Sequence, residues 1–263
     1  MQGTAMDQEF LRLLQDPNTG EPLAYSKEGK NEFLCNHSND RYEIRDGIVG
    51  FLKGETLTGN NQRYQKLYDR LAPVYDLSTR LYARFKEGNV ERRIMQYLRE
   101  LEIHDGQNVI EISVGTGRNL VCLNAPAKYY GLDISFGMLK WCQRTMRKIG
   151  RSVRLVQAEA ERLPIKDDSF DVVFSAGGFN FFNDRTKAVN EMVRIARSGT
   201  KLMISDETEK IRARFEKSFV ARKFYGGQDE VRNPIEFVPN CCRNIEYKEV
   251  CGGELYALTF WKP

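Results

Sequence analysis

The chain has 263 residues and a mass of 30.4 kDa, which fits one large domain or a domain with a small appendage. Its residues are 41% hydrophobic and 29% charged, enough for a full core, and this excludes a disordered or fibrous chain. The 40 Lys and Arg exceed the 36 Asp and Glu by a net charge of +4, too little to indicate a nucleic-acid-binding protein on global charge. No apolar run reaches the length of a membrane span and the polar start has no signal-peptide core, so we expect a soluble, cytoplasmic protein.

The cysteines and histidines exclude two classes of protein. The six cysteines form no CxxC pair, and without a secretory signal they are expected to be reduced thiols. The only histidines are His37 and His104, too few for a His-rich metal centre, and a Ser/His/Asp hydrolase is hard to build from them. We therefore predict no metal site and no hydrolase triad.

Residues 1–53 differ from the rest and are predicted to form a small β-rich unit. A short helix is expected at 6–15, followed by strand-like runs at 23–26, 32–35 and 42–45 and by the closing segment 46–51. Residues 54–62 are polar and turn-rich, which indicates a linker. A unit of about fifty residues usually needs a staple or a partner domain to be stable.

Residues 63–263 are predicted to form an α/β domain, because short apolar runs alternate with helical patterns. The expected strands are 109–112, 129–132, 153–157, 172–175 and 201–205, and the expected helices are 90–101, 118–123, 135–149 and 185–196. This alternation predicts a parallel sheet covered on both faces. The runs 245–251 and 255–261 flank two glycines and predict a C-terminal antiparallel hairpin. We thus expect a Rossmann-like, seven-stranded, mostly parallel sheet, with a lid insertion at about 206–240.

A glycine-rich loop follows the first of these strands, in the sequence Glu111-Ile-Ser113-Val-Gly115-Thr-Gly117. Glycines at this place let backbone approach a ligand at the start of a helix, where N–H groups point outward. The next strand ends at Asp133, placed to accept hydrogen bonds from both hydroxyls of a ribose. These groups lie at the carboxyl ends of neighbouring strands, the usual ligand crevice of an open α/β sheet.

The motifs resemble those of class I S-adenosylmethionine-dependent methyltransferases, in particular the branch of ubiquinone and menaquinone biosynthesis methyltransferases. The loop departs from the dinucleotide pattern G-x-G-x-x-G and is similar to the methyltransferase motif [DE]-x-G-x-G-x-G. Segments 68–76, 159–171 and 191–199 resemble three further stretches of that branch, so the resemblance covers roughly residues 63–263. The departures are Ser113 for the first loop glycine and Ser198 for a proline.

The resemblance implies S-adenosylmethionine as cofactor and assigns its binding residues position by position. Glu111 would orient the loop and the methionine amino group, and Tyr75 would close over the methionine end. Asp133 would bind the ribose. The other implied cofactor-binding residues are Ser113, Gly115, Gly117, Ile134, Met138, Glu159, Ala160 and Ser175. The pair Ile134 and Met138 would pack on the adenine, although ordinary core packing explains both as well.

The implied reaction is in-line transfer of the sulfonium methyl group to a small-molecule acceptor, which needs positioning more than covalent help. The residues Phe179, Phe181 and Phe182 could line an apolar acceptor pocket or belong to the core. The basic runs 140–154 and 210–223 favour an anionic acceptor, RNA or a lipid surface, and RNA methylation is the alternative function. A non-catalytic cofactor-binding partner is a third interpretation. We assign no catalytic base; the candidates are Tyr68, Asp69, Tyr75, Asp76 and Asp206.

The N-terminal unit resembles a small zinc ribbon such as the one that precedes the catalytic domain of an rRNA guanine methyltransferase. In those ribbons paired cysteines hold zinc. Here Asp16 and Asn18 stand where the first pair would be, and only Cys35 and His37 correspond to the second. Because most ligands are lost, we predict a ribbon-like unit without zinc that docks on the catalytic domain.

Overall fold

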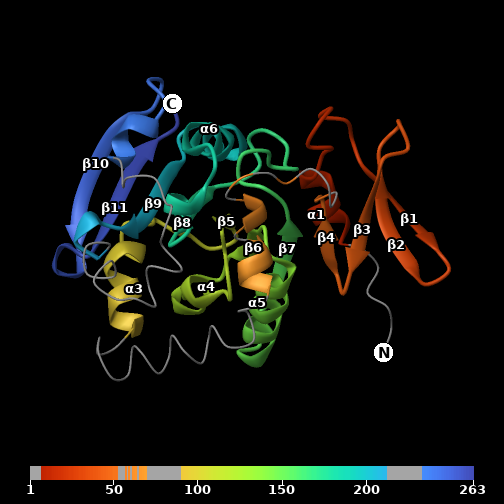
Figure 1. Cartoon of the computed structure of the whole chain (residues 1–263), viewed down its shortest axis with the longest axis horizontal. Coiled ribbons are helices and arrows are strands. Elements are labelled where there is room, and N and C mark those ends of the chain that lie inside the picture. Colours follow the sequence, from red (N-terminus) through yellow and green to blue (C-terminus); the bar gives the residue numbers. More distant parts are fainter. Residues whose placement is uncertain are drawn as a thin grey trace.

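The computed structural model describes residues 7–52, 57, 59, 61–63, 65–69, 90–211 and 233–263. The strands within these ranges form one sheet of eleven, in the order β1-β2-β3-β4-β7-β6-β5-β8-β9-β11-β10 (Figure 1). The predicted residues Tyr75 and Asp76, most of the predicted linker and most of the predicted lid lie outside the described residues.

The larger part of the sheet confirms the predicted Rossmann-like fold. Its strands are β5 (Asn108–Ile112), β6 (Lys128–Asp133), β7 (Val153–Gln157), β8 (Val172–Ala176), β9 (Lys201–Glu207), β10 (Arg243–Val250) and β11 (Leu255–Trp261). Strands β7, β6, β5, β8 and β9 are parallel, and β11 pairs antiparallel with both β9 and β10. The C-terminal hairpin is therefore present as predicted.

Helices cover both faces of this sheet (Figure 1). On one face lie α3 (Val90–Leu98), α4 (Arg118–Cys122) and α5 (Phe136–Lys148), whose apolar side chains form one core cluster with β5, β6 and β7. On the other face α6 (Arg185–Ile195) packs in a second cluster with β5, β8 and β9. Short 3-10 turns at η2 (Phe179–Phe181), η3 (Pro234–Phe237) and η4 (Cys251–Gly253) complete the described elements of this part.

Local capping explains where the two longer helices begin. Ser135 precedes α5, and its hydroxyl accepts a hydrogen bond of 3.1 Å from the amide of Met138. Asp184 precedes α6, and its carboxylate accepts one of 2.9 Å from the amide of Lys187. Both caps fix the helix starts next to the carboxyl ends of strands, where ligands bind in this class of fold.

The N-terminal unit continues the same sheet. It contains α1 (Gln8–Leu13), β1 (Ala24–Glu28), β2 (Asn31–Cys35), β3 (Arg41–Arg45) and β4 (Ile48–Gly50). The sequence pattern predicted no strand at Ile48–Gly50, because three residues are too few to show a period. In the structure β4 pairs in parallel with β7, with Val49 beside Val156, so the small unit extends the larger sheet.

A hydrogen-bonded carboxylate occupies the centre of this unit. Asp16 is fully buried and accepts hydrogen bonds of 2.7 and 3.0 Å from the amides of Asn18 and Thr19. It also accepts a hydrogen bond of 2.8 Å from the side-chain amide of Asn36 and one of 2.7 Å from the hydroxyl of Tyr42. These bonds join the segments that zinc joins in a ribbon. Among the described residues, no group of three or more His, Cys, Asp or Glu is placed to hold a metal ion.

None of the helices in the described part of the chain is long and apolar enough to cross a membrane. All six cysteines are free thiols, and of these Cys142 and Cys242 are buried.

Candidate functional site

A cavity opens at the carboxyl ends of β5, β6, β7 and β8. Its described lining residues are Asn61, Tyr68, Ser113, Gly115, Leu132, Asp133, Ile134, Met138, Ala158, Ala160, Glu161, Gly177, Gly178, Phe181 and Phe182. This place is the ligand crevice of an open α/β sheet.

Six of the predicted cofactor residues line this cavity: Ser113, Gly115, Asp133, Ile134, Met138 and Ala160. The other described ones, Glu111, Gly117, Glu159 and Ser175, are absent from the described lining. Predicted Tyr75 lies outside the described residues. The cofactor assignment of each of these residues stays a prediction.

Asp133 connects the glycine loop to the start of α5. Its Oδ2 accepts a hydrogen bond of 2.8 Å from the amide of Gly115, and its Oδ1 accepts 2.9 Å from the amide of Ser135. Burial raises the pKa of Asp133 to about 6, although these amide hydrogen bonds act in the opposite direction. The carboxylate therefore shapes two sides of the cavity and lines it as well.

The two loop glycines have different structural roles. Gly115 lines the cavity at a φ of 52°, and a β-carbon there would meet no atom within 4 Å. Gly117 has a φ of 79°, and a β-carbon there would lie 2.7 Å from Cys142 Sγ. Gly117 is thus required for close packing of the loop against α5.

Glu111 is fully buried beneath the loop. Its Oε1 accepts 2.5 Å from the side-chain amide of Asn119, whose Oδ1 accepts 2.6 Å from the hydroxyl of Tyr97. Burial raises the pKa of Glu111 well above its ordinary value, and the nearby Asp133 charge adds to this effect. Its Oε2 makes no hydrogen bond within the described part of the chain. A buried carboxyl oxygen without a hydrogen bond is uncommon in a folded protein.

Sequence reasoning missed two polar residues of the cavity, Asn61 and Glu161. The Asn61 side chain donates hydrogen bonds of 3.0 Å to Glu159 Oε1 and 3.1 Å to Glu161 Oε2. It belongs to the predicted linker, where nothing in the sequence indicates a contact about one hundred positions away. Glu159 is held by this bond and by Arg162 at 3.3 Å, whereas Glu161 lines the cavity.

Aromatic side chains contribute apolar surface to the cavity. Tyr68 and Phe181 meet edge to face, with ring centroids 6.3 Å apart, and Phe182 also lines the cavity. Phe179 is different, because it is buried in the core against Phe182 and Phe237. The three phenylalanines left open by the sequence therefore divide into two cavity residues and one core residue.

Two of the base candidates hold local structure. Asp69 Oδ1 accepts 2.5 Å from the hydroxyl of Ser135 and 2.9 Å from the amide of Gly137. Asp206 is buried, its pKa is raised by burial to about 6, and it accepts 2.8 Å from the amide of Asn180. Of the described candidates, Tyr68 is the one that lines the cavity.

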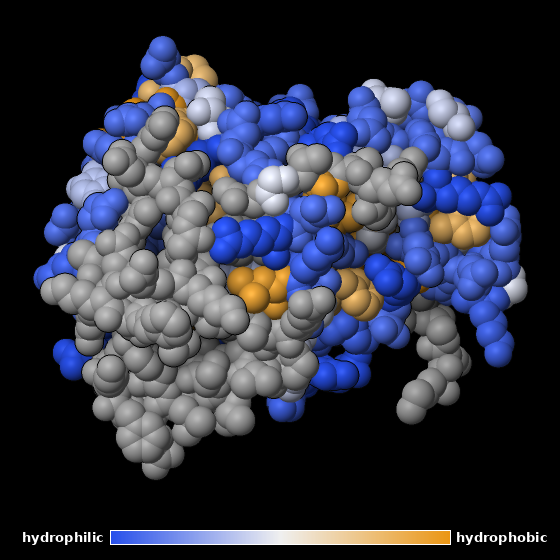
Figure 2. All heavy atoms as spheres, viewed as in Figure 1, coloured by the Kyte–Doolittle hydropathy of each residue, from blue (hydrophilic) through white to orange (hydrophobic). Residues whose placement is uncertain are grey.

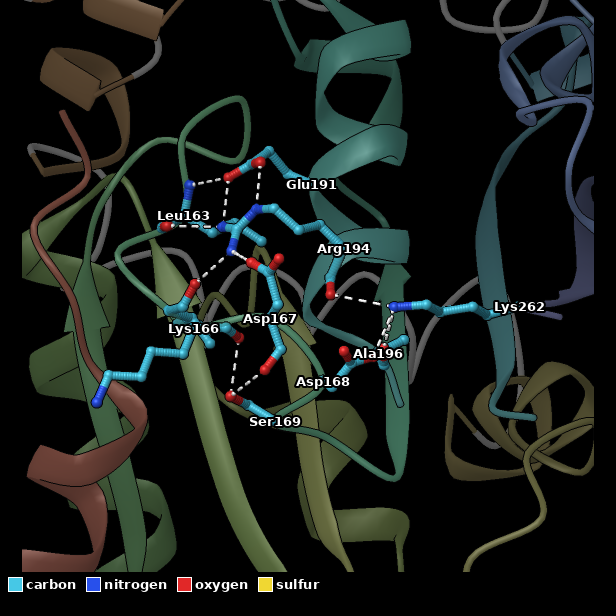
Figure 3. Close-up of polar contacts among 10 residues, drawn as sticks. Leu163, Lys166, Asp167, Asp168, Ser169, Glu191, Arg194, Ala196 and Lys262 are labelled. Atoms are coloured by element: carbon cyan, nitrogen blue, oxygen red, sulfur yellow. Dashed lines mark hydrogen bonds and ion pairs between the residues drawn. The ribbon is translucent and has the colours of Figure 1, made fainter. Parts of the chain in front are cut away.

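The loop that follows β7 is fixed to α6 on one side (Figure 3). The guanidinium of Arg194 donates to the carbonyl oxygens of Ile165 at 2.7 Å and Leu163 at 3.1 Å, and to Asp167 at 2.6 Å. Glu191 pairs with Arg194 at 2.7 Å and accepts 2.7 Å from the amide of Leu163. The Glu191 and Arg194 of the helix-end motif thus hold the loop that carries Ala158 and Ala160 to the cavity.

Comparisons with known proteins agree with this geometry. A family model described as a methyltransferase domain matches residues 110–204. The demethylmenaquinone methyltransferase of Lactiplantibacillus plantarum is 28% identical over 151 residues, which cover 55% of this chain and 62% of that protein. The matched part of this chain is a methyltransferase domain of the class I, S-adenosylmethionine-dependent type.

A second relative has a match of similar extent. The demethylmenaquinone methyltransferase of Thermus thermophilus is 31% identical over 141 residues, covering 52% of this chain and 63% of that one. The chain thus spans less than two thirds of the length of these two curated relatives.

Solved structures share the fold of this chain. A possible histamine N-methyltransferase from Thermotoga maritima superposes with a TM-score of 0.58 at 21% identity, over 76% of this chain and 99% of that one. The [4+2]-cyclase SpnF superposes with a TM-score of 0.62 at 13% identity, over 81% and 99%. At these identities the likeness extends to the fold alone.

S-adenosylmethionine is the cofactor of this family, and the residues present fit it. The cavity offers the Asp133 carboxylate as an acceptor for ribose hydroxyls, and loop backbone lies beside it. The buried, unpartnered Oε2 of Glu111 supplies an acceptor beneath the loop.

Proposed function

We propose that the protein transfers the methyl group of S-adenosylmethionine to a small-molecule acceptor with an apolar or aromatic part. The observation that carries this proposal is one cavity lined by two unlike sets of residues. One set is Asp133 with the glycine loop, and the other is Tyr68, Phe181 and Phe182. A polar cofactor and an apolar acceptor can therefore share one cavity.

The chemistry asks the protein mainly to position two reactants. The acceptor atom forms a bond to the methyl carbon while the bond from carbon to sulfur breaks, and the electron pair of that bond stays on sulfur. A site that holds both groups in line and excludes water lowers the barrier without covalent catalysis. Tyr68, Phe181 and Phe182 would exclude water around the acceptor.

The names of the relatives support a small acceptor. The curated proteins that match include demethylmenaquinone methyltransferases and ubiquinone/menaquinone biosynthesis C-methyltransferases. Each of these names refers to a small molecule with an apolar ring system, in accord with the aromatic residues that line the cavity. We extend this class of acceptor, and not a particular quinone, to the present chain.

Three of the six basic side chains in the run 140–154 have partners inside the protein. Lys140 pairs with Asp46 at 2.6 Å, and Arg154 pairs with Asp7. Arg151 donates 3.0 Å to the carbonyl oxygen of Leu120. The second basic run, 210–223, lies almost wholly outside the described residues. The face drawn in Figure 2 is largely hydrophilic in its described part, with small hydrophobic patches, as expected of a protein whose apolar ligand enters a cavity.

The test is direct. Purified protein is incubated with methyl-labelled S-adenosylmethionine and fractionated cell extract, and the label is then separated by solubility and nuclease sensitivity. We expect label in an organic-soluble, small-molecule fraction. Label in a nuclease-sensitive polymer would favour RNA methylation. Cofactor binding without transfer to any fraction would favour the non-catalytic interpretation.

A further inference from the structure

The N-terminal unit contacts the catalytic part where β7 ends, on the side of the sheet marked by β4 in Figure 1. Beyond the paired strands, the amide of Phe51 donates 2.8 Å to the carbonyl oxygen of Gln157. Gln157 is the last residue of β7, and the cavity residue Ala158 follows it directly. The unit is thus joined to the backbone at the edge of the cavity.

A second attachment holds the loop that follows. The amide of Gln15 donates 3.1 Å to the carbonyl oxygen of Pro164, and the amide of Lys166 donates 2.9 Å to that of Leu13. These bonds come from the N-terminal unit, whereas the contacts of the same loop drawn in Figure 3 come from α6. The loop that carries the cavity residues is therefore held by the N-terminal unit and by α6.

A third attachment uses side chains. The guanidinium of Arg162 donates 2.5 Å to Asn18 Oδ1 and pairs with Glu159 at 3.3 Å. A small cavity of about 370 Å³ lies between Phe51, Asn18 and Arg162 and shares Ala158 with the larger one. The wall between the two cavities is thus built from both parts of the chain.

Arg45 contacts two residues that lie close in the sequence to lining residues of the cofactor cavity, Phe136 and Gln157. Its guanidinium lies 4.3 Å from the ring centroid of Phe136, the first residue of α5, and its Nη2 donates 3.4 Å to Gln157 Oε1. The other end of that side-chain amide donates 3.1 Å to the carbonyl oxygen of Ile134. Ile134 lines the cavity between Asp133 and α5. A chain of contacts therefore runs from the N-terminal unit to a cavity residue.

We propose that the N-terminal unit is a positioning element of the cofactor site and that Arg45 is its positioning residue. Arg45 holds Gln157 and Phe136, and these two residues fix the backbone of Ile134 and the start of α5. This proposal rests on the proposed function, because it takes the cavity to bind S-adenosylmethionine. It assigns to residues 7–52 a role in cofactor affinity in addition to any effect on stability.

The chain offers a matched control in Arg41, on the same strand β3. Arg45 and Arg41 side chains are 49% and 50% exposed. Each pairs with one exposed glutamate, Arg45 with Glu43 and Arg41 with Glu28, and each lies over a phenylalanine ring. The ring under Arg41 belongs to Phe33 of the N-terminal unit itself, at 4.5 Å. The two arginines thus differ in whether their contacts reach the catalytic part.

The experiment measures S-adenosylmethionine binding by calorimetry for the full chain, Arg45→Ala, Arg45→Lys and Arg41→Ala, with thermal unfolding of each. We expect Arg45→Ala to raise the Kd by roughly three- to tenfold, since it removes one cation–π contact and one hydrogen bond. Arg45→Lys should recover part of the loss, and Arg41→Ala should bind like the wild type. In turnover assays the KM for S-adenosylmethionine should rise in Arg45→Ala, with kcat at saturating cofactor unchanged.

The outcomes separate this proposal from the proposed function. Equal Kd values for Arg45→Ala and Arg41→Ala, with tight wild-type binding, would overturn the positioning role alone. A wild-type chain that binds no S-adenosylmethionine would overturn the proposed function. If Arg45→Ala does not fold, Asn18→Ala replaces it, because it removes the Arg162 contact from the exposed side of the same loop. Unchanged affinity in that variant would also overturn the proposal.

Discussion

Ser113 and Gly178 face each other across the ends of the neighbouring strands β5 and β8. A β-carbon on Gly178 would lie 2.6 Å from Ser113 Oγ and closer still to Ser113 Cβ. Ser113 has a φ of 64° and stands where the family motif has its first loop glycine. The serine side chain thus occupies space that a side chain at 178 would need, and the glycine at 178 makes the departure at 113 possible.

We expect Gly178→Ala to weaken S-adenosylmethionine binding by about tenfold or more, because overpacking at a tight contact costs about 1–3 kcal/mol. The backbone of Gly178, with a φ of −134°, is open to alanine, so the effect comes from the contact with Ser113. The double variant Ser113→Gly/Gly178→Ala should recover most of the affinity. Calorimetric titration of the four proteins of this cycle measures the coupling, and additive effects of the two substitutions would refute it.

Cofactor affinity should increase as the pH rises from about 5 to about 7.5, because Asp133 titrates in this range. Burial raises the pKa of Asp133 from 3.8 to about 6. The protonated carboxyl therefore stabilises the folded state fully below pH 3.8, and this stabilisation is lost as the pH rises through about 6. Ligand hydroxyls that donate to the carboxylate favour its ionised form. Ionisation of Asp133 is therefore favoured in the ligand-bound protein and opposed by burial in the ligand-free protein.

The pH dependence can be assigned with two variants and Kd measurements across the range. Asp133→Asn should bind more weakly and lose most of the dependence. Asp206→Asn should keep the dependence, because Asp206 has a pKa raised to about 6 but is not among the described lining residues of the cavity. A flat wild-type profile, or a slope retained in Asp133→Asn, would contradict the role of Asp133.

Most strands and helices of the catalytic part could be predicted because each is a local pattern. Strands 153–157 and 255–261 match β7 and β11, since each is a mainly apolar run bounded by turn residues. The strand β4 could not be predicted, because its three residues become a strand only by pairing with β7, more than one hundred positions away. Sequence periodicity carries no information on such a pairing.

The site was predictable in position but not in the direction of its side chains. The motif places Glu111 and Gly117 in the glycine loop, yet Glu111 lies beneath it against Asn119, and Gly117 packs on Cys142. Asp133 and Ile134 were predictable because a residue at the end of a parallel strand reaches the crevice in this fold. The Arg45 contact depends on the docking of two units, which no local pattern encodes.

Replacing Asp16 with Asn should lower the free energy of unfolding by about 2–3 kcal/mol, because charge-assisted hydrogen bonds in a buried place are lost. Burial opposes ionisation of Asp16, but the bonds from Tyr42, Asn18, Thr19 and Asn36 outweigh it and lower its pKa. The stabilisation is therefore present above the ordinary aspartate pKa and lost as the pH falls through the lowered value. The difference from the wild type should shrink in acid.

Two controls accompany denaturant unfolding of Asp16→Asn. Asp46→Asn removes an exposed pair with Lys140, so it should change stability by less than about 1 kcal/mol. A strong chelator should leave the Tm of the wild type unchanged, because hydrogen bonds to Asp16 join the segments that zinc would join. A lower Tm in chelator would show that the unit holds a metal and would overturn this interpretation.

The loop between β7 and β8 should depend on Arg194 far more than on its neighbour Arg197. Arg194→Ala removes bonds to Leu163, Ile165 and Asp167 and leaves Glu191 without its partner, so we expect a loss of about 2–4 kcal/mol in unfolding free energy. Arg197 also forms an ion pair, with Asp171, but its side chain is 46% exposed, and Arg197→Ala should cost less than about 1 kcal/mol. Because the loop carries Ala160 to the cavity, Arg194→Ala should also weaken cofactor binding at temperatures where it remains folded. Equal destabilisation by the two substitutions would show that the loop is held by packing and not by this guanidinium.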